Sequence, residues 1–146
     1  MNGRIKKTVY GFILFFITLT GFAQMPIFKR YYIADIPGLG WLAQFYVTHA
    51  IHYILASVLL GFGLYVAADV QLNGKGIGSL SLTGRLRTGL ILGLMVSGGF
   101  MVVRNLAGVY FSHTSIHLMN LFHVGFCMAL LGVTLFALVT RKNWTV

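Results

Sequence analysis

One apolar stretch near the C-terminus decides the fold. Residues 113–139 read HTSIHLMNLFHVGFCMALLGVTLFALV and contain no acidic residue, lysine or arginine. An α-helix rises about 1.5 Å per residue, so roughly 20 apolar residues cross the hydrocarbon core of a bilayer, which is about 30 Å thick. The stretch therefore predicts a membrane-spanning helix.

Three further runs have the same character and cover about residues 9–25, 41–68 and 84–103. The 146-residue chain is 58% hydrophobic and 9% charged, and its mean hydropathy is +0.84. It has too little polar surface to cover a soluble globule. The sequence predicts an all-α, four-helix transmembrane bundle that forms one integral membrane domain, residues 1–146. Chemistry on a large polar substrate would then belong to another subunit.

The first run also fits a second interpretation. Basic residues precede it, and Gly21-Phe22-Ala23 has the small-x-small pattern of a leader cleavage site, as in a secretory signal peptide. In either case Pro26 is expected to end the helix, because proline cannot continue the backbone hydrogen bonding.

The basic residues indicate an orientation rather than a nucleic-acid surface. The net charge is +9, but the eleven lysines and arginines lie at helix ends in groups of one to three. The N-terminus, the second connection and the C-terminus carry eight of them, and the other two connections carry three. Cytoplasmic loops are enriched in lysine and arginine, so both termini are predicted to be cytoplasmic. The predicted partner is the lipid bilayer and not nucleic acid.

Two histidines lie at matching depth in separate runs. His52 is eleven residues past Trp41, and His123 is ten residues past His113, so each is about 15 Å along its helix. An ionisable side chain inside a span is costly and normally has a partner. Equal depth suits two axial imidazoles on one iron, so His52 and His123 are the candidate ligands of one b haem.

Other polar residues lie nearer the outer surface. His49 and His117 each precede one candidate ligand, and Arg104 ends the third run. All three are therefore candidates to line the haem site or to bind a quinone. The alternatives stay open: buried histidines that bond to carbonyls or to each other, and an arginine that marks the membrane boundary. A zinc or copper site is less well supported, because no cysteine or carboxylate lies at a ligand spacing.

Small residues mark the third run, and the only cysteine lies in the fourth. Gly89-x-x-x-Gly93 and Ser97-Gly98-Gly99 allow close helix packing, and beside a haem they would leave room for the macrocycle. Packing alone also explains them. Cys127 is interpreted as a core residue, and a single cysteine excludes an intrachain disulfide and a cysteine-ligated iron–sulfur cluster within this sequence.

Several of these motifs resemble a known family. The Ala-Ile-His52-Tyr-Ile-Leu-Ala stretch, Leu82-Thr-Gly-Arg with Ser97-Gly98-Gly99, and Leu121-Phe-His123-Val-Gly look like the membrane cytochrome b (gamma) subunits of respiratory formate dehydrogenases and nickel–iron hydrogenases. The resemblance implies a b haem near the periplasmic face, held by His52 and His123. It also implies an anchor in a bacterial or archaeal cytoplasmic membrane, passing electrons between a periplasmic iron–sulfur or multihaem subunit and menaquinone or ubiquinone.

The chain departs from that family at the second haem. The family's cytoplasmic haem uses a histidine in the first helix and another about fourteen residues after the first ligand of the fourth. Here the first run has no histidine, and the corresponding position in the fourth is Ala137. One haem is therefore expected, with exchange of electrons near its outer edge, among His49, His117, Arg104, Asn105 and the connection from Tyr31 to Asp35.

Two other functions remain open. One is a haem-free membrane anchor or assembly subunit whose histidines are structural. The other is a small transporter subunit with histidines in a proton path, but such paths commonly include carboxylates, and the only acids, Asp35 and Asp69, lie at helix ends or in loops.

Overall fold

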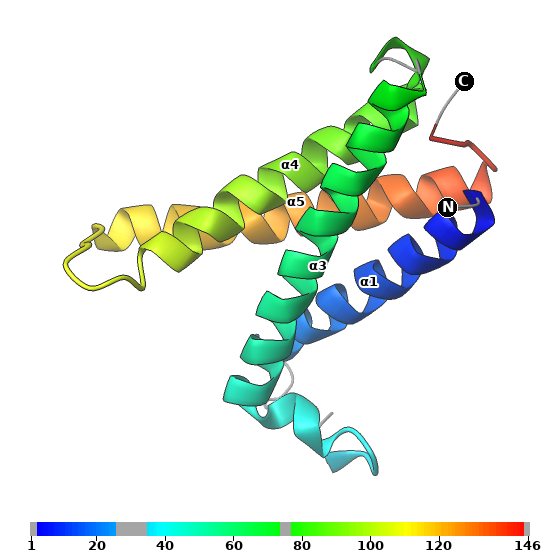
Figure 1. Cartoon of the computed structure of the whole chain (residues 1–146). Coiled ribbons are helices and arrows are strands. Elements are labelled where there is room, and N and C mark those ends of the chain that lie inside the picture. Colours follow the sequence, from blue (N-terminus) through cyan, green and yellow to red (C-terminus); the bar gives the residue numbers. More distant parts are fainter. Residues whose placement is uncertain (1–2, 26–34, 74–76, 145–146) are drawn as a thin grey trace. The chain divides into compact units, whose positions relative to one another are not determined.

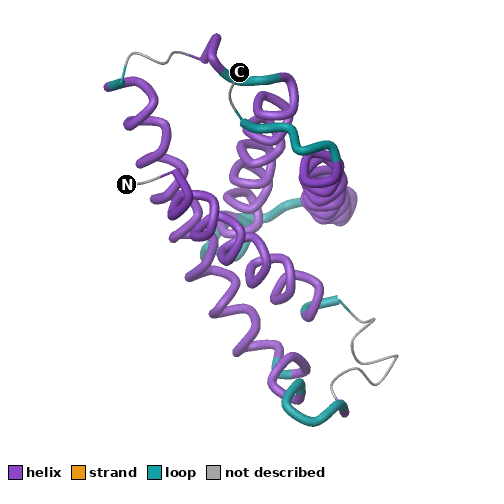
Figure 2. Tube along the Cα trace, turned by 90° about the vertical axis from the view of Figure 1, so that its right-hand side faces the viewer, coloured by secondary structure: helices purple, strands orange, loops and turns teal. Residues whose placement is uncertain are grey.

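The computed structural model describes residues 3–25, 35–73 and 77–144. In these ranges the chain forms four long α-helices, joined by loops and short 3₁₀ turns, and no strand (Figures 1 and 2). The helices are α1 (Gly3–Ala23), α3 (Phe45–Leu72), α4 (Leu82–Val103) and α5 (His113–Val139), and the 3₁₀ turns are η2 (Gly40–Ala43) and η3 (Ile77–Ser79). The all-α fold class is therefore confirmed.

All four long helices have the length and composition of membrane spans. Their most apolar windows have mean hydropathies of 1.4, 1.9, 1.7 and 2.2 in chain order. Large apolar side chains point outward from them, for example Phe12, Leu64 and Leu121, which are each more than 60% exposed. In water such a surface would be unstable, whereas in a bilayer it contacts lipid.

The helix bounds differ from the predicted ones at three starts and at two ends. α1 runs from Gly3 to Ala23 rather than from about residue 9 to about residue 25, and α3 ends at Leu72 rather than at about residue 68. α3 begins at Phe45, because Gln44 has an extended backbone (φ −82°, ψ 94°) that separates the helix from the η2 turn containing Trp41. α4 is capped by Ser81, whose Oγ accepts from the Gly84 N–H at 3.1 Å, so the helix begins at Leu82, two residues before the predicted start.

The chain divides into two compact units, residues 1–69 and 70–146, which are called here the N-terminal unit and the C-terminal unit. In the N-terminal unit α1 and α3 run antiparallel. Lys6 at the start of α1 forms an ion pair with Asp69 near the end of α3. At the opposite end Gln24, just after α1, bonds to His49 in the first turns of α3.

The C-terminal unit is an antiparallel pair of α4 and α5. Ser97 contacts His123 midway along the pair, and the segment after α5 folds back onto the start of α4. There the Ser81 N–H donates to the Trp144 carbonyl at 2.9 Å, and the Arg87 guanidinium lies 4.3 Å from the Trp144 ring centroid. This cation–π contact gives the buried Arg87 charge a favourable partner inside the unit.

Candidate functional site

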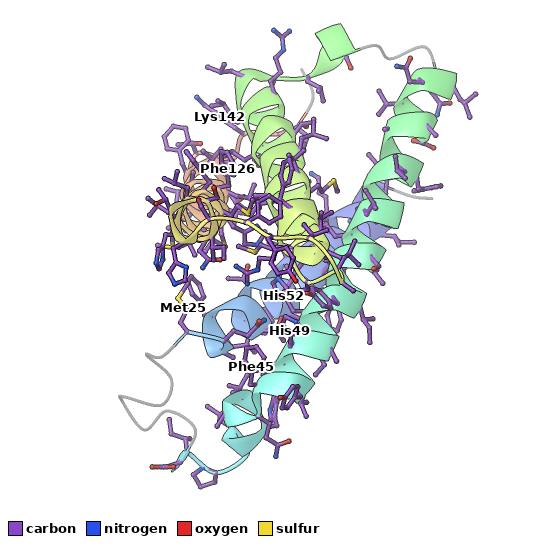
Figure 3. All side chains as sticks on the ribbon, turned by 90° about the vertical axis from the view of Figure 1, so that its left-hand side faces the viewer. Met25, Phe45, His49, His52, Phe126 and Lys142 are labelled. Atoms are coloured by element: carbon purple, nitrogen blue, oxygen red, sulfur yellow. The ribbon has the colours of Figure 1, made fainter. Side chains whose placement is uncertain are left out.

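His52 is held against α1 by its Nδ1 atom. That nitrogen lies 3.0 Å from the Ile17 carbonyl oxygen and 3.2 Å from Thr20 Oγ1. A backbone carbonyl can only accept a hydrogen bond, so Nδ1 carries the hydrogen and Nε2 carries the ring lone pair. Figure 3 shows His52 on the stretch of α3 beside α1.

The local sequence of α1 explains this contact. Thr20 is completely buried, and its hydroxyl donates to the Phe16 carbonyl one turn earlier at 2.8 Å, so its oxygen is available as an acceptor. The next residue is Gly21, where a Cβ atom would lie only 3.2 Å from His52 Cε1. Because glycine has no side chain, the imidazole can lie directly on the α1 backbone.

His123 has the same arrangement in the C-terminal unit. Its Nδ1 lies 2.9 Å from Ser97 Oγ, which also lies 3.2 Å from the Leu94 carbonyl. When the serine hydroxyl donates to that carbonyl, it accepts from Nδ1–H, and Nε2 carries the lone pair. We assign this tautomer by analogy with His52, whose carbonyl partner can only accept. A Cβ atom on Gly98 would lie 3.4 Å from His123 Cε1.

Each unit thus contains one copy of the same arrangement, which we call the hydroxyl–glycine seat. It consists of Thr20-Gly21 for His52 and Ser97-Gly98 for His123. A neutral imidazole with Nδ1–H bonded to an acceptor is the form in which histidine ligates a metal through Nε2. The sequence analysis singled out Ser97-Gly98 but missed Thr20-Gly21, although both are a small hydroxyl residue followed by glycine.

Comparison with protein-family models, curated proteins and solved structures finds no match to this chain. The site is therefore interpreted from its geometry and from the sequence motifs.

The donor set fits a haem better than a bare metal ion. Among the described residues, no group of three or more histidine, cysteine or acidic side chains could hold a metal. Structural zinc sites use four protein ligands and catalytic zinc sites three. A haem iron receives four nitrogens from its macrocycle and needs at most two side chains, so two histidines would be enough to hold it. The glycines of the two seats also remove the Cβ atoms that would push each ring away.

His49 is tied to the same helix as His52. Its Nδ1 lies 2.9 Å from Gln24 Oε1, and the Gln24 Nε2 donates to the Thr20 carbonyl at 3.1 Å, which fixes the amide orientation. The ring is stacked on Phe45 with centroids 5.1 Å apart, and it lies 4.3 Å from the Tyr53 ring. Figure 3 shows His49 between Phe45 and His52 along α3. Sequence reasoning did not identify Gln24.

The remaining predicted residues are distributed differently. Arg104 caps α4, and its Nη1 lies 3.4 Å from Asn120 Oδ1 on α5. His117 is exposed, and its ring centroid is 6.3 Å from that of His113, one turn earlier. Asn105 and Asp35 are also exposed, and Tyr31 to Ala34 of the predicted exchange region lie outside the described residues. These contacts anchor Arg104 to α5 and give it no part in the seat of His123.

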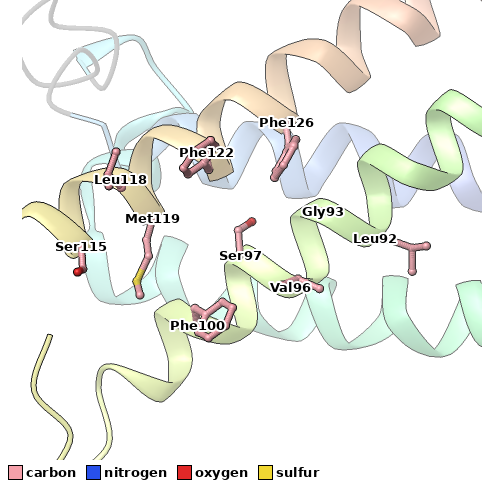
Figure 4. A pocket seen from close by; sticks show the side chains of 10 residues that line it. All are labelled: Leu92, Gly93, Val96, Ser97, Phe100, Ser115, Leu118, Met119, Phe122 and Phe126. Atoms are coloured by element: carbon pink, nitrogen blue, oxygen red, sulfur yellow. The ribbon is translucent and has the colours of Figure 1, made fainter.

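The C-terminal unit also contains an apolar groove of about 660 Å³ between α4 and α5. Phe100, Phe122 and Phe126 line it, with the hydroxyls of Ser97 and Ser115 as polar groups (Figure 4). Ser97 therefore contacts the groove on one side and His123 on the other.

Proposed function

We propose that this chain is the b-haem-containing membrane anchor and electron-transfer subunit of a multi-subunit respiratory oxidoreductase. The observation that carries the proposal is the repeated seat, in which Nδ1 of His52 and Nδ1 of His123 are each bonded to a neighbouring helix. In the proposal, Nε2 of each ring ligates the iron. A b haem ligated by both histidines supplies one-electron exchange. A haem held by two histidines of the protein would supply electron transfer rather than oxygen chemistry.

In the proposal, the two histidines lie at similar depths in their helices. His52 is seven residues past Phe45, and His123 is ten residues past His113. The difference of three residues is less than one helical turn. Similar depth of the two histidines is therefore kept as part of the proposal, together with cytoplasmic termini. Both rings lie in apolar helices with no acidic residue nearby in sequence.

Electron exchange with other molecules is proposed at the outer end of the helices. His49 with Gln24 lies at that end of the N-terminal unit, and Arg104 and His117 lie at that end of the C-terminal unit. These side chains offer hydrogen-bonding groups to menaquinone or ubiquinone, or to a haem propionate, beside apolar helix surface. A periplasmic iron–sulfur or multihaem cytochrome subunit is the proposed redox partner. The exposed apolar side chains provide surface for other membrane subunits.

The ligand assignment is tested by single substitutions in the full chain, purified with the subunits that copurify. We expect His52→Ala and His123→Ala each to abolish haem incorporation or to reduce it strongly, because a one-sided site loses half of its protein bonds to iron. The matched control is His113→Ala, an exposed histidine at the start of α5, which should retain haem. Full haem content in both ligand variants would remove the assignment.

A haem-free anchor or assembly subunit is the second candidate. The bonds of His52 and His123 to α1 and α4 are also what a purely structural buried histidine would make. Under this alternative both alanine variants would lower the stability of the helix pairs, and the wild-type protein would have no visible absorption.

A further inference from the structure

We infer that Thr20 and Ser97 are positioning residues, whose hydroxyls hold the two ligand imidazoles in the ligating tautomer and set the reduction potential of the haem. This inference rests on the proposed function. It adds two residues that have no chemistry of their own at the iron and act only through His52 and His123.

The burial and the hydrogen bonds of the two hydroxyls suit them to this role. Thr20 is completely buried and Ser97 is 8% exposed, so neither bond competes with bulk water. Each hydroxyl gives its hydrogen to a carbonyl of its own helix, that of Phe16 at 2.8 Å and that of Leu94 at 3.2 Å. The oxygen lone pairs are then the acceptors that the imidazole Nδ1–H groups meet, at 3.2 and 2.9 Å.

An acceptor on Nδ1–H makes Nε2 a stronger electron donor. Hydrogen bonding from the far side of a ligand imidazole fixes the ring orientation and raises its basicity. A more basic ligand stabilises ferric iron more than ferrous iron, because it donates charge to the more positive ion. Loss of either hydroxyl should therefore raise the midpoint potential and weaken haem retention.

The two seats differ in one respect that the experiment can use. His52 Nδ1 also lies 3.0 Å from the Ile17 carbonyl, which remains when the Thr20 hydroxyl is removed. Thr20→Val should therefore raise the midpoint potential and weaken haem retention, as Ser97→Ala does, but by a smaller amount.

The test is a redox titration of the purified haem-loaded complex carrying Thr20→Val or Ser97→Ala. For Ser97→Ala we expect a positive shift equivalent to about a tenfold change in the reduction equilibrium, which is about 59 mV for one electron. Haem retention should fall about tenfold, the lower end of the usual loss on removing such a partner. Thr20→Ser and Ser97→Thr keep the hydroxyl and should restore both values to those of the wild type.

Two threonines provide matched controls. Thr48 in α3 is completely buried and bonds the Gln44 and Phe45 carbonyls, and Thr88 in α4 bonds the Gly84 carbonyl. Thr48→Val and Thr88→Val remove hydroxyls that donate to backbone carbonyls. Both should leave the potential and the low-spin ferric electron paramagnetic resonance spectrum of the wild type unchanged.

Each outcome is decisive. If Ser97→Ala does not accumulate, Ser97→Cys keeps the volume and replaces the oxygen by a weaker acceptor, and its potential should also shift upward. Potentials, haem retention and spectra of the Thr20 and Ser97 variants equal to those of the two controls would overturn this inference and leave the proposed function intact. A wild-type complex without haem would overturn both.

Discussion

Gly21 and Gly98 set how closely each candidate ligand approaches the neighbouring helix. An added Cβ would lie 3.2 Å from His52 Cε1 at Gly21 and 3.4 Å from His123 Cε1 at Gly98. The first distance is tighter than ordinary van der Waals contact, so the imidazole would have to move, whereas the second lies at the edge of normal contact.

These distances predict an order of effects. Gly21→Ala should lower haem content or shift the haem spectrum, and Gly98→Ala should do so less, when both are measured by absorption of the purified protein. Gly99→Ala is the matched control, because a Cβ there meets nothing within 4 Å. Equal haem content and spectra in all three variants would contradict the close seating of His52.

The sequence singled out the two histidines but not their hydrogen-bond partners. His52 and His123 are visible from the sequence because an ionisable residue in an apolar run is rare. Thr20 and Gln24 are not, because their contacts join residues 32 and 25 positions apart, and these depend on how α1 packs against α3. A threonine in a helix usually bonds its own backbone, so the sequence gives no sign that Thr20 also contacts a histidine on another helix.

At the scale of the element, hydropathy predicted the spans better than the helix starts. The predicted bounds of α5 agree with the structure, because Ser112 caps the helix directly before the apolar run. The start of α3 was misplaced because Trp41, Leu42 and Ala43 are as apolar as a helix but form a 3₁₀ turn. Apolar composition alone does not distinguish an α-helical turn from a 3₁₀ turn.

The fold-back of the chain onto α4 makes a prediction for one glycine. A Cβ at Gly84 would lie 2.1 Å from the Trp144 carbonyl oxygen, a backbone atom that the Ser81 N–H also bonds. Gly84→Ala should therefore displace this segment and destabilise the C-terminal unit by about 1–3 kcal/mol, the usual cost of overpacking.

Thermal unfolding in detergent measures this effect. Gly89→Ala, five residues later in α4, is the matched control, because its Cβ meets nothing within 4 Å. A Gly84→Ala protein as stable as the Gly89→Ala protein would show that the fold-back contributes nothing to the stability of the unit.

At the scale of the whole molecule, the proposed orientation is testable through two exposed residues. Tyr110 in the connection between α4 and α5 is 93% exposed, and Leu72 at the end of α3 is 88% exposed. In a Cys127→Ser background, Tyr110→Cys should react with a membrane-impermeant maleimide in intact spheroplasts, and Leu72→Cys should react only after permeabilisation. The reverse labelling pattern would show that the excess of lysine and arginine does not mark the cytoplasmic side in this chain.

The proposed haem stoichiometry concerns the whole chain. From the sequence, a second haem is expected to need a histidine at position 137, which is a buried alanine. One haem per chain is therefore expected, as the sequence analysis also predicted.

The haem content of the purified wild-type protein tests the central claim most directly. A pyridine haemochrome assay, with absorption spectra before and after reduction, should give one b haem per polypeptide and a sharp reduced α-band. A flat visible spectrum would contradict the haem proposal and leave the membrane anchor. Two haems per chain would contradict the assignment of a single site to His52 and His123.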